Sequence, residues 1–452
     1  MYWQEIDDVI YILILFGLAV LIKRLIPVFR RYLIPNSIIA GFFGLIVGPN
    51  LLNWLPLDPD TLGGIIYHLM AIGFISLSLR NPDKKKKDWN SLNAGLIIVS
   101  TYLVQGIFGF AASFLWSLAD KRVFPVMGLI LPLGFGQGPG QAFSIGNQWE
   151  QMGMANGGAI GLAIAAAGFG WATVGGIIIL NILLKNKRKK YEEIKIEEKK
   201  AITVQDYEFS DMDGLTIQFV FIGIVYASVY LLLGGVNLLL GKLGTFGESL
   251  GTVLWGFHFV FGAILAIVFR RVYNKAHEKG IAKEKYLNNF LLQRIAGFVF
   301  DFMVAASISA VTFERIADSF WPIFVITFTG GILTFVYVSF IVRKTMKEHR
   351  LANTIAFFGH LTGTISTGMA LLREVDPLMK SGAPENMIFG SGVAIFFGFP
   401  LMALLSLPPI GLKEGNPMLY LYTFLGLIVY AALLFGYWFL ISRRKNKVTT
   451  KM

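Results

Sequence analysis

Two stretches of this chain place glycine and polar side chains together inside its most apolar regions. The first reads GFGQGPGQAFSIGNQW over residues 134–149, and the second reads FGHLTGTISTGMALLREVDP over residues 358–377. Glycine lets other groups approach the backbone closely, and the exposed carbonyl, hydroxyl and amide oxygens are the ligands that hard cations prefer. The stretches therefore predict a binding site. Its candidate contacts are Gly136, Gln137, Gly138, Gly140, Gln141, Ser144, Gly359, His360, Thr362, Gly363, Thr364, Ser366 and Thr367.

The chemistry of these residues suits a monovalent hard cation together with an anion. A short helix that starts after each stretch would point its positive N-terminal end at the site, which favours a carboxylate. Ligands for Na⁺ are expected among Gln137, Gln141, Ser144, Thr362, Thr364 and Thr367, although the sequence does not separate ion ligands from substrate ligands. The glycine spacing of each stretch, taken alone, is more typical of helix packing in membranes.

Three charged or titratable residues extend the candidate site. Asp301 is a carboxylate well inside an apolar segment, AGFVFDFMVAASIS. It either couples transport to an ion or proton, pairs with Arg294, or lies in the protein interior without either role. Arg373 closes the second stretch and either grips a substrate carboxylate or is a solvated end charge. His360 either contacts the substrate, senses protons or makes a structural hydrogen bond.

The composition identifies a multi-pass membrane protein. Hydrophobic residues make up 55% of the 452 residues and charged residues 15%, where a soluble domain has about 25% charged residues. The absence of cysteine excludes disulfides and thiol catalysis, and neither a metal-binding HExxH spacing nor a hydrolase triad occurs, so we expect no enzyme and no cofactor. The basic central segment mixes both charge signs, which argues against nucleic-acid binding.

Hydropathy predicts an all-α fold with eleven membrane helices. They are expected at about 9–26, 36–55, 62–80, 91–118, 155–184, 214–241, 249–269, 289–313, 319–342, 387–410 and 418–441. Most Lys and Arg residues fall in alternate loops, and positive loops stay cytoplasmic. The protein is therefore expected in the cell inner (plasma) membrane, with its N-terminus outside and its C-terminus in the cytoplasm.

This orientation leaves 123–150 and 351–386 beginning and ending on one side of the membrane, so each is expected to be a re-entrant loop. The first repeat (1–184) and the second (214–410) then each contain five helices and one such loop, in inverted orientation. A hydroxyl residue follows four positions after Gly140 and after Gly363, which supports the duplication. The remaining parts are a basic cytoplasmic linker (185–213) and an extra helix with a basic tail (411–452).

Both stretches, with NGGAIGLAIAAAGFGWATVGG after the first, resemble the glutamate:sodium symporter family, a distant relative of the 2-hydroxycarboxylate:sodium symporters. The resemblance covers most of residues 1–410. It implies two inverted five-helix repeats with re-entrant loops, a homodimer, and sodium-coupled uptake of an anionic amino acid by an elevator-type movement. This chain has Gly136-Gln137-Gly138-Pro139 where the family carries a histidine in a glycine-rich run, and its long central loop and eleventh helix also differ.

The leading hypothesis is therefore a secondary active symporter that couples inward Na⁺ movement to uptake of glutamate or a similar small anion by alternating access. A channel or facilitator for a small solute is the alternative, because two re-entrant loops that meet within the membrane also describe such channels. The two differ in whether substrate accumulates against its gradient.

Overall fold

The computed structural model describes residues 6–26, 34–81, 89–184, 212–281, 286–346, 348–376 and 379–449. The predicted linker 185–213 lies almost wholly outside these residues. Eight helices in the described ranges are long and apolar enough to cross a membrane, and a ninth span results if the bent pair α11–α12 counts as one. The chain is thus a helical, multi-pass membrane protein.

The apolar segments form helices in the order that hydropathy predicts. The principal ones are α1 (Asp7–Leu25), α3 (Asn36–Val47), α4 (Pro59–Leu79), α5 (Trp89–Ala119), α6 (Pro139–Gln151), α7 (Gly157–Gly170), α8 (Gly176–Leu184), α10 (Met212–Leu240), α11 (Gly244–Gly256), α12 (His258–Glu278), α13 (Asn289–Ser309), α14 (Phe313–Ile316), α15 (Phe320–Thr345), α16 (Arg350–Thr362), α17 (Ile365–Leu372), α18 (Ala383–Leu405), α19 (Leu407–Lys413) and α20 (Met418–Thr449). Short 3₁₀ and π-helical turns, η2 (Met127–Ile130), η3 (Leu133–Gln137) and η4 (Trp171–Gly175), join or extend some of them.

Three expected helices differ from the observed ones. The helix expected at 36–55 ends at Val47, because Pro49 disfavours a helical conformation for Gly48, which is extended. The helix expected at 249–269 is two helices, α11 and α12, that meet at Phe257 with a bend of 65°. The helix expected at 387–410 ends at Leu405, and the short α19 follows it.

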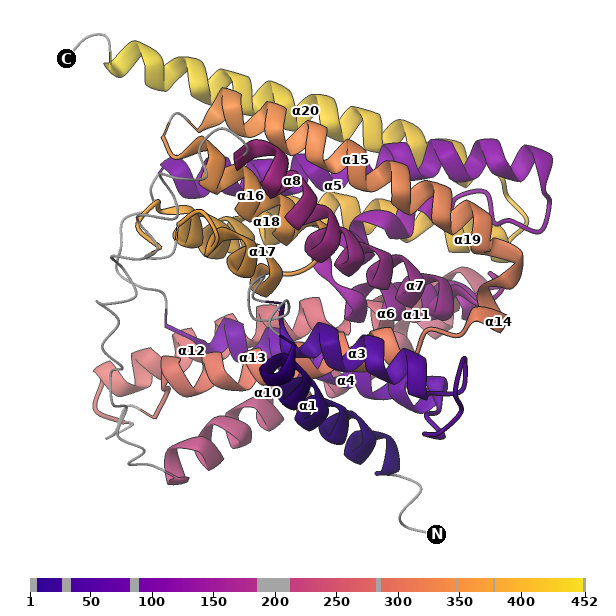
Figure 1. Cartoon of the computed structure of the whole chain (residues 1–452), viewed down its shortest axis with the longest axis horizontal. Coiled ribbons are helices and arrows are strands. Elements are labelled where there is room, and N and C mark those ends of the chain that lie inside the picture. Colours follow the sequence, from indigo (N-terminus) through magenta and orange to yellow (C-terminus); the bar gives the residue numbers. More distant parts are fainter. Residues whose placement is uncertain are drawn as a thin grey trace.

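The helices form two groups (Figure 1). The first helix group contains α1, α3, α4, α10, α12 and α13, which contact one another around the α4–α13 pair. The second helix group contains α5, the segment from η2 to α8, and α15 to α18, in which α5 contacts both α15 and α18. The groups meet where α6 and α7 contact α4 and α13.

The last helix, α20, lies along the outside of the second helix group, against α5 and α18 (Figure 1). Its buried Trp438 donates an indole hydrogen bond of 2.9 Å to the Asn93 amide oxygen on α5. At the other end of α5, Arg122 pairs with Asp120 and with Asp318 near the start of α15. The Arg122 guanidinium lowers the pKa of the Asp120 carboxyl by hydrogen bonding to it.

Candidate functional site

Both glycine-rich stretches interrupt a helix inside the protein. In the first, η3 ends at Gln137 and α6 begins at Pro139, with Gly138 between them at φ 102°. This backbone conformation is open to glycine and costly for other residues, so Gly138 permits the turn. In the second, α16 ends at Thr362 and α17 begins at Ile365. We call these two interruptions, Gly138 and Gly363–Thr364, the first break and the second break.

The two breaks adjoin. A Cβ atom added to Gly138 would lie 4.0 Å from the Thr364 methyl group. The α7 residue Gly168 approaches both, since a Cβ there would lie 2.6 Å from the Thr362 carbonyl oxygen and 2.9 Å from the Phe135 ring. Segments more than 200 residues apart in the sequence therefore meet as the predicted site requires.

Helix ends of both signs converge at this meeting point. The N-termini of α6 and α17 present first-turn N–H groups and the positive dipole ends, which attract an anion. The C-termini of η3 and α16 end in carbonyl groups, which suit a cation. Thr364 closes the first turn of α17 through a reciprocal capping box with Thr367. The arrangement can hold a cation and an anion side by side.

One face of α5 holds the C-terminal end of both interrupted helices. The Tyr102 hydroxyl donates a hydrogen bond of 2.9 Å to the Gly136 carbonyl oxygen, and the Gln105 amide donates one of 3.0 Å to the Leu361 carbonyl oxygen. Residues three apart share a helix face, so α5 positions both ends at once. Gln105 also donates to Thr334 on α15, so it joins α5 to a second helix as well.

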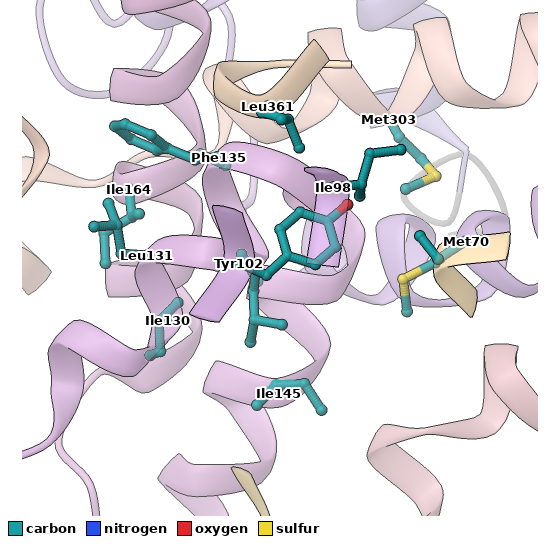
Figure 2. Close-up of a cluster of buried hydrophobic side chains, with 14 of the residues drawn as sticks. Met70, Ile98, Tyr102, Ile130, Leu131, Phe135, Ile145, Ile164, Met303 and Leu361 are labelled. Atoms are coloured by element: carbon teal, nitrogen blue, oxygen red, sulfur yellow. The ribbon is translucent and has the colours of Figure 1, made fainter. Parts of the chain in front are cut away.

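Apolar side chains surround the breaks. Figure 2 shows Tyr102 among buried side chains that include Ile98, Leu131 and Leu361. On the side of the first helix group, a Cβ on Gly140 would meet Met303 and would lie 3.0 Å from the Met70 Cβ atom. The methionines of α4 and α13 thus close the site from that side.

The space near the second break is small. A cavity of about 10 Å³ lies beside Thr367, lined also by Pro35, Thr173 and Leu371. That volume corresponds to roughly one water molecule, so this cavity is too small for a molecule of amino-acid size.

Several predicted residues do lie at the breaks, and two carry buried atoms that lack a partner within the described protein. The side-chain oxygen of Gln141, in the first turn of α6, has no hydrogen-bond partner although the residue is 4% exposed. His360 is 5% exposed, and its Nε2 lies 3.1 Å from the Ser391 hydroxyl. Because Ser391 donates to the Met387 carbonyl, His360 donates through Nε2 and its Nδ1 is an unpartnered acceptor.

The threonine hydroxyls are partly committed to the backbone. Thr362 donates to the Phe358 carbonyl oxygen, and Thr367 donates to the Gly359 carbonyl oxygen at 2.7 Å or to that of Thr364 at 2.8 Å. Their remaining lone pairs can still accept or coordinate. Gln137 is half-buried at the end of η3. Gly359 packs closely against Gly368 of α17, so it also serves helix packing.

Three predicted residues lie away from the breaks, and Ser366 lies beside the second break in the first turn of α17. Ser144 donates to the Gly256 carbonyl oxygen at the α11–α12 bend, Ser366 is exposed, and Arg373 is exposed at the end of α17. The pair of Asp301 with Arg294, one of the alternatives for this residue, is not formed: Asp301 accepts a hydrogen bond from Ser37 at the start of α3, and Arg294 lies over the Phe290 ring. Sequence reasoning missed Tyr102, although its spacing of three from Gln105 marks a shared polar face in an apolar helix.

Comparisons of the chain with models of protein families, with curated proteins and with solved structures found no match.

Proposed function

We propose that the chain is a secondary active symporter that couples inward Na⁺ movement to uptake of glutamate or a similar small anion. One observation carries the proposal: two interrupted helices bring two positive N-termini and two carbonyl-bearing C-termini together, with the first break buried and the second partly exposed at the start of α17. Helix ends of this kind bind the substrate carboxylate and the coupling ion in secondary transporters. A cation and an anion that neutralise each other there also lower the cost of burying either charge.

The pattern of helix contacts supports an inverted repeat. Let α1, α3, α4 and α5 of the first repeat correspond to α10, α12, α13 and α15 of the second. The contact between α3 and α13 then corresponds to the contact between α12 and α4. In the same way, the contact between α1 and α3 corresponds to the contact between α10 and α12. The α4–α13 and α5–α15 contacts are their own counterparts. A pseudo-twofold axis would produce this pattern, and the paired breaks fit it.

In an alternating-access mechanism, the two helix groups would move relative to each other at the boundary between them. A second cavity of about 40 Å³ lies on this boundary, where Asp60 and Arg315 face Asn147 and Glu150. Arg315 binds Asp60 through two parallel hydrogen bonds of 2.5 and 2.6 Å. In the proposed orientation this polar cavity faces outside, so it would admit solutes when the second helix group moves against the first.

Uptake of radiolabelled L-glutamate into proteoliposomes tests the function. We expect wild-type protein to accumulate glutamate only with an inward Na⁺ gradient, and Gly140→Leu to abolish uptake because the new side chain would overlap Met70 and Met303. Gly64→Leu is the matched control, since no atom lies within 4 Å of a Cβ at that glycine. Flux that merely equilibrates and ignores Na⁺ would favour a channel, and absence of glutamate uptake would remove glutamate as the substrate.

A further inference from the structure

The bend between α11 and α12 places a histidine between two hydrogen-bond acceptors. His258 begins α12 and is 1% exposed. Its Nδ1 lies 3.1 Å from the Trp255 carbonyl oxygen at the end of α11, and its Nε2 lies 3.0 Å from the Tyr67 carbonyl oxygen on α4. Both neighbours are carbonyl oxygens, which accept hydrogen bonds and cannot donate them.

This geometry discriminates between the charge states of the ring. A neutral imidazole has one N–H group and one lone pair, so one nitrogen would face a carbonyl oxygen with its lone pair. The imidazolium has two N–H groups and satisfies both carbonyls. The carbonyl of Trp255 also belongs to the C-terminal end of α11, where the helix dipole favours a positive charge.

The Tyr67 ring adds a third stabilising contact. It stacks on the His258 ring with centroids 3.7 Å apart and an interplanar angle of 18°, within the range of cation–π attraction. The Tyr67 hydroxyl donates to the same Trp255 carbonyl oxygen at 2.8 Å. Burial of a charged His258 ring carries a desolvation cost. Two charge-assisted hydrogen bonds and the Tyr67 aromatic face offset this cost.

The other titratable groups near the ring are Tyr67 and His68 on α4 and Tyr226 on α10. His68 Nδ1 lies 2.6 Å from the Tyr226 hydroxyl, so these two groups are engaged with each other. Within the described part of the chain, no carboxylate forms an ion pair with His258. The carbonyl groups therefore replace the acidic partner that a buried histidine cation usually has.

We propose that His258 binds a proton in this conformation and that the bend is a proton site separate from the two breaks. The site is linked to the moving parts, because Ser144 of α6 donates to the Gly256 carbonyl oxygen at 2.9 Å, one residue after Trp255. The His258 proton, together with the Tyr67 hydroxyl, thus holds the Trp255 carbonyl, and the Ser144 hydroxyl holds the next carbonyl, that of Gly256. Loss of the proton loosens the contact between α6 and the bend.

Nitrogen-15 NMR of the full-length, histidine-labelled protein in detergent tests the proton site without reference to transport. The chain has five histidines, and His258→Gln identifies the His258 signal, with His277→Gln on the same helix as the matched control. We expect both His258 nitrogens to be protonated at about pH 8, where an unperturbed histidine is neutral. A non-protonated ring nitrogen at that pH would overturn the proposal.

The coupling to α6 rests on the proposed symport and is tested by uptake at a fixed Na⁺ gradient. We expect wild-type and His277→Gln uptake to fall as the pH rises, by about tenfold per pH unit once His258 loses its proton, and His258→Gln uptake to lack this dependence. A pH profile that persists unchanged in His258→Gln would overturn the coupling. If wild-type protein takes up nothing, the symport proposal fails, while the NMR result still decides the proton site.

Discussion

Replacement of Gly146 by valine is expected to prevent stable folding. A Cβ at Gly146 would overlap the Gly157 carbonyl oxygen and lie 2.8 Å from its carbonyl carbon, and a Cβ at Gly157 would overlap the Gly146 carbonyl oxygen. Backbone atoms cannot rotate away as a side chain can, so α6 and α7 would have to separate. Overpacking of this kind costs typically about 1–3 kcal/mol for side-chain neighbours, and we expect at least about 3 kcal/mol here because the neighbour is backbone.

Thermal unfolding of the purified protein, followed by tryptophan fluorescence, measures the effect. Gly170→Val is the control on the same helix pair, because nothing lies within 4 Å of a Cβ at Gly170 on α7. An unfolding temperature for Gly146→Val equal to that of Gly170→Val would show that α6 and α7 do not pack through their backbones.

Replacement of Gln105 by leucine is expected to reduce Na⁺-driven uptake by at least about fivefold while the protein stays folded. The change removes the donor to the Leu361 carbonyl oxygen, at the end of α16 beside the second break. An unpaired buried acceptor costs about 1–3 kcal/mol, and a loss of that size at the site corresponds to roughly 5- to 150-fold in a rate or binding constant. Initial uptake rates in proteoliposomes, normalised to folded protein, measure it.

Thr334→Val separates positioning of the break from general packing. It removes the acceptor of the Gln105–Thr334 bond and leaves the Gln105–Leu361 bond in place. We expect Thr334→Val to retain most of the uptake. Equal losses of uptake in Gln105→Leu and Thr334→Val would mean that Gln105 acts only by joining α5 to α15. The second break would then not depend on the bond from Gln105 to Leu361.

The sequence predicted most of the membrane helices because long apolar segments leave few alternatives. Eleven were expected, and within the described residues eight are long and apolar enough to cross a membrane, or nine if α11 and α12 form one span. The sequence also located both breaks, since glycine with proline or threonine in the middle of apolar sequence disfavours a continuous helix. The break between α11 and α12 was not predicted, and one continuous helix was expected there. The reason is that Gly256-Phe257-His258 carries no proline and only one polar side chain. The bend is held by tertiary hydrogen bonds from Tyr67 and Ser144, which one sequence does not reveal.

The site was predicted at the level of segments and less well at the level of side chains. Gln141 and Thr364 lie at the breaks, while Ser144 faces the bend instead, because α6 turns that side toward α11. A pair with Arg294 was one alternative for Asp301, from their spacing of seven residues, yet Ser37 from α3 binds it. In both cases the partner comes from a distant segment, so helical periodicity could not identify it.

Equilibrium binding of radiolabelled L-glutamate to the purified protein tests most directly whether a cation and an anion bind together at the two breaks. We predict glutamate binding that requires Na⁺, and a roughly tenfold higher Na⁺ requirement in Gln141→Leu, which removes the unpartnered buried oxygen beside the first break. Ser228→Ala, which changes an exposed hydroxyl on α10, should bind as the wild type does. Glutamate binding that is independent of Na⁺, or a Gln141→Leu variant with an unaltered Na⁺ requirement, would contradict the account.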